Sequence, residues 1–393
     1  MDNIKLEIGS FPFYWRTTGP HDNKIDFPTK VMNFNLMVDE VSGFFKQERS
    51  KGLLATIEDI YQLDHNIGYL QEGAGELETY GKDFFEFILS AIEHSDIDTS
   101  QFFSVLDIGC GGGFILNQLS NKYLNAKVMG IEPSPIAKRA SQKLGFLLIE
   151  EFYPPEQRNR VARTNIILHY DVLEHVEEPL SFLEDVHRDL AEDGIVIFSV
   201  PDCTTAIENG DISMLIHEHL NYFSVDSLGF LVKQAGFENV KVIQGNHGGT
   251  LLCSARKGNK KTHVVLDKKS TLFNFERFKE KNKTLVARIE EILAKNSDKT
   301  IGFYVPLRAI PYISTLKIKG DFRFFDDSDF FRNKYLDGFN EIIIEGFEEL
   351  KKHPVDIVLI MTHAYGMAID KRISAAGIDT KTILLQDLFD FKR

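Results

Sequence analysis

The feature that most constrains this chain is an apolar segment that ends in an acid and runs into a glycine-rich turn. Residues 105–108 read Val-Leu-Asp-Ile, and Gly109, Gly111 and Gly113 follow at alternate positions before an apolar helical stretch. Glycine lets a backbone turn sharply and approach a ligand closely, while the first turn of a helix offers free N–H groups. Nucleotide-like cofactors bind at such strand-to-helix turns. A glycine turn that serves only helix packing is the alternative.

The residues around this turn favour S-adenosylmethionine over a dinucleotide. Dinucleotide sites follow the pattern G-x-G-x-x-G, whereas the glycines here run G-x-G-x-G. Asp107 stands where it can meet a cationic amino group, which methionine carries and a pyrophosphate lacks. Glu132 follows the next predicted strand and is placed for ribose hydroxyls. We therefore predict an S-adenosylmethionine site.

Apolar runs alternate with helical stretches on both sides of the turn. Such alternation predicts βαβ units and a parallel sheet covered on both faces. The predicted central strands are residues 105–108, 127–131, 146–149, 165–168 and 194–200, followed by a hairpin of 240–243 and 251–255. A long helix over 272–294 precedes a second series of strands at 300–304, 322–325, 341–344, 356–361 and 382–385.

These patterns predict three domains. Residues 1–75 should form a small strand-rich or irregular module, and residues 76–257 a central Rossmann-like α/β domain. The polar stretch 257–261 marks the next boundary, so residues 258–393 should form a second Rossmann-like α/β domain. This second domain shows no glycine-rich phosphate fingerprint.

Composition narrows the class of protein. The net charge of −13 and the pI near 5.4 argue against a nucleic-acid partner, which would need a surplus of Lys and Arg. No apolar run of about 18 residues and no leader pattern is present, so we expect a cytoplasmic protein without a membrane partner. The cysteines, Cys110, Cys203 and Cys253, lie far apart and lack the spacing of a zinc site. An oligomer is compatible with all of this.

Several segments together resemble the sugar C-methyltransferase family. They are VLDIGCGGGF, GIEPSPIAKRA, DVLEHVEEPLSFL, HEHLNYFS and NHGGTLL, in that order. The resemblance implies an S-adenosylmethionine-dependent enzyme that methylates nucleotide-linked deoxysugars, with a central cofactor domain and a Rossmann-like C-terminal domain. The latter is implied to close over the nucleotide end of the substrate, although its residues fit a packing or dimerisation domain equally well.

The resemblance also implies a set of cofactor-binding residues. The glycine loop and the two acids are expected to hold the cofactor. The residues that follow the third and fourth strands are expected to line the site on its adenine side and its methionine side. The expected residues are Asp107, Gly109, Cys110, Gly111, Gly113, Glu132, Phe152 and Asp171.

The chain departs from the family pattern in two places. The family typically begins with a zinc module held by cysteines, whereas this chain has no cysteine before Cys110. The family also often carries tyrosine just before His-Glu-His, where this chain has Ile216. The sugar or the methylated position can therefore differ here.

Methyl transfer is an in-line displacement, so the enzyme must supply alignment and a deprotonated acceptor. Histidine is a suitable base, and a nearby carboxylate can orient it. We predict His219 as the base with Glu218 and His175 assisting, since the resemblance points to the same residues. A solvated polar turn around 218 and a packing role for His175 are the alternatives.

Three further expectations concern the site. Tyr69 and Tyr222 are weak candidates for substrate contacts, and a buried structural role is the alternative for Tyr69. We expect no metal, because neighbouring residues of His217-Glu218-His219 alternate in direction on a strand and no HExxH spacing is present. Residues 247–250 are expected to form a hairpin turn.

The sequence therefore predicts C-methylation of a nucleotide-linked ketosugar next to the ketone. O-methylation of a sugar in capsule, lipopolysaccharide or other glycan synthesis is the first alternative. A non-catalytic binding protein on the same fold is the second, and a nicotinamide oxidoreductase is disfavoured by the glycine spacing.

Overall fold

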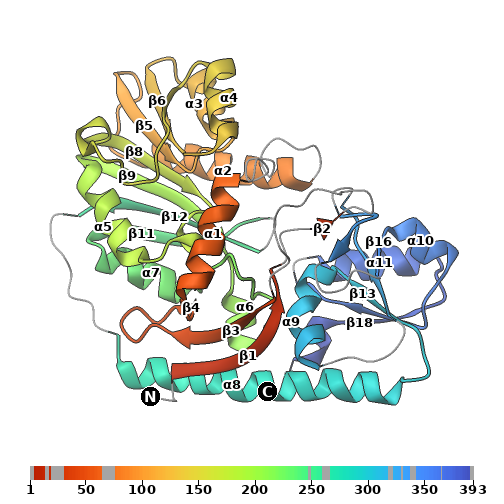
Figure 1. Cartoon of the computed structure of the whole chain (residues 1–393). Helices are drawn as coiled ribbons and strands as arrows, with labels where there is room; N and C mark the ends of the chain where they lie inside the picture. The colour runs from red at the N-terminus through yellow and green to blue at the C-terminus, as the bar shows by residue number, and fades with distance from the viewer. Residues whose placement is uncertain are drawn as a thin grey trace.

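The computed structural model of this chain describes residues 4–13, 17–18, 31–63, 76–246, 249–258, 266–316, 322–328, 331–336, 342–363 and 365–389. Three sheets of four or more strands organise them (Figure 1). The fold is a Rossmann-like α/β fold, as predicted. The predicted domain limits near residues 75 and 257 stay a prediction.

The central sheet has seven strands in the order β11-β12-β9-β8-β5-β6-β7. Its members are β5 (Phe103–Ile108), β6 (Ala126–Ile131), β7 (Leu147–Ile149), β8 (Thr164–Tyr170), β9 (Leu190–Pro201), β11 (Phe237–Gln244) and β12 (Thr250–Lys257). The five strands from β7 to β9 are parallel, whereas β12 pairs antiparallel with both β9 and β11. The predicted strands and the terminal hairpin are therefore confirmed.

Helices cover both faces of this sheet. They are α2 (Glu76–Glu93), α3 (Phe114–Lys122), α4 (Pro135–Leu144), α5 (Pro179–Asp189) and α7 (Val225–Gln234), whereas α6 (Thr204–Asn209) packs against the core that contains α8. One apolar cluster joins α2 and α3 to the sheet, and another joins α5 and α7 to it. Because both faces are buried, the central strands are continuous apolar runs.

The N-terminal segment is strand-rich, with one helix. Its strands β1 (Lys5–Pro12), β3 (Val31–Val38) and β4 (Phe45–Gln47) pair antiparallel, and α1 (Lys51–Leu63) follows. The fourth strand of this sheet, β10 (Asn221–Tyr222), comes from the far side of the central domain and pairs with β4. The N-terminal sheet is thus completed by a segment more than 170 residues later in the chain, since Lys46 pairs with Asn221.

The C-terminal sheet is parallel, with the order β16-β14-β13-β17-β18. Its elements are α8 (Lys268–Lys295), β13 (Ile301–Tyr304), α9 (Pro306–Leu316), β14 (Phe322–Phe325), β16 (Ile344–Glu345), α10 (Phe347–Lys352), β17 (Ile357–Ile360), α11 (Gly366–Ala375) and β18 (Lys381–Leu384). A separate pair of two-residue strands joins β2 (Thr17–Thr18) to β15 (Tyr335–Leu336). The order of the five-stranded sheet is that of a doubly wound fold.

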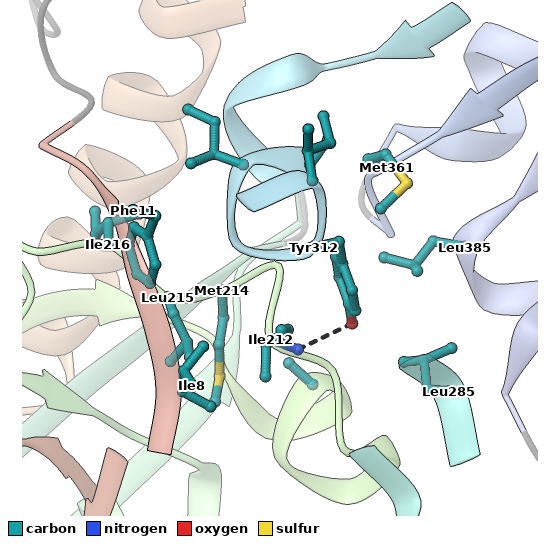
Figure 2. Close-up of a cluster of buried hydrophobic side chains, with 14 of the residues drawn as sticks. Ile8, Phe11, Ile212, Met214, Leu215, Ile216, Leu285, Tyr312, Met361 and Leu385 are labelled. Atoms are coloured by element: carbon teal, nitrogen blue, oxygen red, sulfur yellow. Dashed lines mark hydrogen bonds between the residues drawn. The ribbon is translucent and has the colours of Figure 1, made fainter. Parts of the chain in front are cut away.

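One apolar core joins the N-terminal sheet, the segment 203–222 and the C-terminal domain. Ile8 and Phe11 of β1 share it with Tyr312 of α9 and Leu285 of α8 (Figure 2). The helix α8 runs beneath both regions (Figure 1). The Tyr312 hydroxyl accepts a hydrogen bond from the backbone N–H of Ile212 at 3.0 Å. The N-terminal segment is therefore packed into the rest of the molecule rather than standing apart.

Among the helices that the structure describes, none is both long enough and apolar enough to cross a membrane.

Candidate active site

The glycine turn lies between β5 and α3, at the carboxyl edge of the central sheet. Gly109, Gly111 and Gly113 all have positive φ, at 74°, 46° and 74°. A Cβ atom on Gly109 would lie 2.7 Å from a methyl of Val172 and 4.0 Å from a carboxylate oxygen of Glu132. The turn therefore needs glycine both for its backbone conformation and for the space beside Glu132.

Two acids flank this turn, as predicted. Asp107 is buried within β5, and Glu132 follows β6 with its carboxylate accepting a hydrogen bond from the Ser134 N–H at 2.9 Å. Burial and the charge of Glu132 raise the pKa of Asp107 to about 8, and burial raises the pKa of Glu132. A buried acid whose ionisation is opposed by a second, partly buried acid favours a cationic ligand.

The remaining predicted cofactor residues differ in exposure. Cys110 is buried, and its sulfur packs toward Gly130 and Phe146, so only its backbone is available to a cofactor. Phe152 follows β7 and is 54% exposed. Asp171 follows β8 with φ 52°, and its carboxylate accepts from the Ser199 hydroxyl at 3.0 Å. Their cofactor roles stay predictions.

The predicted histidines His175 and His219 meet beside this edge. His175 lies in a 3-10 turn, Leu173–His175, after β8, and its ring centroid is 4.9 Å from that of His219 in an edge-to-face arrangement. The Nδ1 of His175 bonds the backbone carbonyl of Glu218 at 2.8 Å. Segments 43 residues apart are therefore held together by this contact.

Both rings are desolvated. Burial lowers the pKa of His175 to about 4. Burial, followed by the charges of His175 and Arg308, lowers the pKa of His219 well below its usual value. Both imidazoles are therefore neutral at pH 7 and keep a lone pair for a proton or a ligand.

Glu174 is part of this cluster, although the sequence analysis did not select it. Its side chain is 1% exposed, and one of its carboxylate oxygens is 3.8 Å from Nε2 of His175. Burial and the charge of Asp171 hold its pKa well above the usual value. Its place beside His175, directly after a predicted strand, was the available signal. Arg308, on α9, carried no comparable signal.

His217 belongs to the core and not to this cluster. Its Nδ1 is 3.0 Å from the side-chain nitrogen of Gln47, and its Nε2 is 3.0 Å from the carbonyl of Phe11. Its ring also packs on Phe11, Phe13 and Phe34. Both ring nitrogens are therefore engaged in joining the N-terminal sheet to the segment that precedes β10.

The structure places Tyr222, an expected substrate contact, in the core. The Tyr222 side chain is fully buried, and its hydroxyl accepts from the N–H of Ile216 at 3.1 Å and donates to the carbonyl of the same residue at 2.8 Å. It closes the turn that presents His219, and its role toward a substrate stays a prediction. Tyr69, His247 and Gly248 lie outside the described residues.

Residues 47–242 match a family of methyltransferase domains. The ubiquinone biosynthesis O-methyltransferase of Actinobacillus pleuropneumoniae is 30% identical over 105 residues, which are 24% of this chain and 44% of that protein. The enzyme of the same name from Ruegeria pomeroyi is 28% identical over 163 residues, which are 37% of this chain and 65% of that protein. The match thus spans less than two thirds of either relative.

Solved structures of other methyltransferases are similar at a lower level. The Burkholderia thailandensis 1,6-didemethyltoxoflavin-N1-methyltransferase covers 57% of this chain and 96% of its own, with 16% identity and a TM-score of 0.40. The DszA carbon methyltransferase covers 50% and 58%, with 12% identity and a TM-score of 0.39. The family match, joined to the glycine turn and its two flanking acids, shows that residues 47–242 form a methyltransferase domain whose cofactor is S-adenosylmethionine.

Proposed function

We propose that the chain transfers the methyl group of S-adenosylmethionine to a carbon next to the ketone of a nucleotide-linked deoxysugar. The observation that carries this proposal is the contact between the partly buried His175 and the buried His219 at the carboxyl edge of the sheet. The resemblance of the His-Glu-His and Val-Leu-Glu-His segments to sugar C-methyltransferases supports the substrate class.

In this mechanism His219 removes the proton next to the ketone. The electron pair of that C–H bond delocalises into the ketone and forms an enolate. The enolate carbon attacks the methyl carbon of S-adenosylmethionine, and the electron pair of the C–S bond that breaks stays on the sulfur. A neutral imidazole can accept the proton. The Glu174 carboxyl group has an oxygen within 4.8 Å of a ring nitrogen of His219, so its ionised form can stabilise the imidazolium that forms. His175 is held in place through its Nδ1 by the Glu218 carbonyl.

Incubation with methyl-labelled cofactor and a panel of ketodeoxysugar nucleotides tests the substrate class. We expect label in at least one sugar, and a fall in kcat of about 100-fold or more in His219→Gln, within the range for loss of a general base. His94→Gln, an exposed histidine directly after α2, is the matched control and should keep full activity. Label in none of the sugars contradicts the substrate class.

The names of the relatives favour a second candidate, methylation of a hydroxyl. An oxygen acceptor also needs a base, so the same histidines would serve. Solvent deuterium exchange at the sugar carbon, measured with S-adenosylhomocysteine in place of the methyl donor, separates the two. Exchange supports a carbon acceptor. A labelled ether product without exchange supports an oxygen acceptor.

A further inference from the structure

We propose that Glu174, His175 and His219 form a binding site for a divalent transition metal of the zinc type, and that the bound metal switches methyl transfer off. The metal-binding half of this proposal stands on geometry alone. The inhibitory half rests on the proposed function, because it requires that His219 act as the base.

The three residues offer one donor atom each, and these atoms lie within 4.8 Å of one another. A tetrahedral or octahedral metal with bonds near 2.0 to 2.2 Å needs donors about 3 to 4 Å apart, so rotamer changes alone can close the site. Two imidazoles and one carboxylate are ligands that zinc, cobalt, nickel and copper accept.

The orientation of His175 is that of a metal ligand. Its Nδ1 bonds the Glu218 carbonyl at 2.8 Å, so the ring presents Nε2 to Glu174 and His219. Histidine ligands almost always engage their second nitrogen with a carbonyl, carboxylate or water in this way, which fixes the tautomer and the ring plane.

Glu174 supplies the second observation. Its side chain is 1% exposed, yet among the described residues no donor reaches its Oε2 oxygen. A buried carboxylate oxygen without a donor is costly unless the group is neutral or meets a cation. A metal at this point would satisfy that oxygen, and nearby Asp171 adds negative charge in the same direction.

Buried histidine alone does not make such a site, as His217 shows. Both of its ring nitrogens are engaged, by Gln47 and by the Phe11 carbonyl. The string His217-Glu218-His219 is therefore not the ligand set. His219 instead joins the Glu174-His175 pair from a segment more than 40 residues earlier in the chain, which the spacing within 217–219 could not reveal.

Metal binding and proton removal compete for the same lone pair on the His219 imidazole. A metal bound to an imidazole nitrogen takes the electron pair that would accept the proton from the substrate. The metal should therefore abolish turnover without weakening cofactor binding, because Asp107, the glycine turn and Glu132 lie outside the ligand set.

Cobalt(II) provides a direct readout of binding. The full-length protein, freed of metal by a chelator, is titrated with Co²⁺, and the visible d–d absorption is recorded. We expect one bound ion per chain, with affinity at least 10-fold weaker in Glu174→Gln. Glutamine mimics the neutral acid, so the fold is retained, which a thermal shift with S-adenosylhomocysteine verifies. Glu177→Gln, an exposed neighbour, is the matched control and should bind like the unaltered protein.

The outcomes separate the two halves. Equal Co²⁺ binding by the unaltered protein and Glu174→Gln overturns the site. Binding that depends on Glu174 together with inhibition by Zn²⁺, reversed by chelator, supports both halves. Binding with unchanged turnover, or turnover that requires the metal, overturns the switch. Full activity in His219→Gln defeats the proposed function instead, and the Co²⁺ spectrum still decides the site.

Discussion

The central and C-terminal sheets have equivalent backbone hydrogen bonds after their first strands, but they differ at the point where a ligand could approach. After the first strand of the central sheet, the N–H of Gly109 donates to the carbonyl of Ile131 at 2.9 Å. After the first strand of the C-terminal sheet, the N–H of Val305 donates to the carbonyl of Phe325 at 3.0 Å. Val305 has φ 61°, so both residues also adopt the left-handed conformation.

The equivalence extends to the acids that follow the second strands. The N–H of Glu132 bonds the carbonyl of Ile149, and the N–H of Asp326 bonds the carbonyl of Glu345, each on the third strand. The surroundings differ, however. Next to Asp326, Asp327 accepts from Arg372 and from the Tyr304 hydroxyl, whereas the charge of Glu132 raises the pKa of the buried Asp107. The shared backbone arrangement alone thus does not make a cofactor site. The room beside the turn and the charges around the acids decide whether a cofactor can bind.

Replacing Gly109 by valine, the residue at the equivalent position of the C-terminal sheet, should have the largest effect on cofactor binding. Gly109→Val places a branched side chain at φ 74° with its Cβ 2.7 Å from Val172, beside Glu132. We expect affinity for S-adenosylhomocysteine to fall at least 100-fold, or about 2.7 kcal/mol, by calorimetric titration.

Gly145→Ala is the control for this exchange. Gly145 has φ 79°, and a Cβ atom there would meet nothing within 4 Å. It carries the conformational cost without the crowding, so its cofactor affinity should be unchanged. A similar loss of affinity in both variants would show that backbone strain, rather than the closed approach, is responsible.

Ionisation of Asp107 should make cofactor binding depend on pH. Because the pKa of Asp107 is about 8 in the free protein, a cationic amino group must displace its proton at lower pH. Affinity should therefore fall up to tenfold per pH unit below about 8. In Asp107→Asn this slope should vanish and affinity at pH 8 should fall about 30-fold, measured by titration from pH 6 to 9.

The stability of the free protein should depend on pH in the opposite direction to cofactor affinity. An acid with a raised pKa in the folded state stabilises the free protein fully below its unfolded pKa near 3.8, and this contribution is lost as pH rises through about 8. Asp107→Asn should thus raise the melting temperature of the free protein at pH 8.5, on the order of 5 °C. An unchanged slope of affinity in that variant would assign the pH dependence to another group.

The two acids after the second strands give a smaller contrast. Glu132→Gln should weaken cofactor binding about tenfold, since an amide accepts hydrogen bonds from ribose hydroxyls less strongly than a carboxylate. Asp326→Asn, at the equivalent place, should leave it unchanged. Isothermal titration of both variants measures this. Equal losses would mean that the C-terminal sheet also contributes to the cofactor site.

The reverse exchange, Val305→Gly, should have the smallest effect. It removes a β-branched residue from φ 61° and with it some packing beneath the C-terminal sheet. These terms oppose each other, so the unfolding free energy should change by about 1 kcal/mol or less, with no change in cofactor affinity. Chemical denaturation measures the change. A gain of cofactor binding at the second sheet would contradict the role given to charge.

Much of the fold was predictable because buried parallel strands leave continuous apolar runs. Residues 322–325 were predicted as a strand with both ends correct, and the predicted helix 272–294 lies within α8. The two-residue strand β10 was not predicted, because its pairing with β4 depends on contacts between segments far apart in the chain.

The site was predictable where one local pattern carries it. The glycine turn with Asp107 and Glu132 was found in this way. Spacing could not show that His217 faces the N-terminal core while His219 meets His175, because residues 217–219 lie in an irregular turn that lacks the regular side-chain period of a strand. Nor could it show that the Tyr222 hydroxyl is used by the backbone of Ile216.

The pairing of β10 with β4 has a consequence for how such a protein can change over generations. The residue just before β10 is Leu220, whose N–H bonds the carbonyl of Glu174 and whose carbonyl accepts from Gln47 of β4. The N-terminal strands therefore hold the turn that carries His219 in position. A recombination event that replaced them with a foreign segment would have to bring a matching β10 along, so this module and this turn should be inherited as one unit.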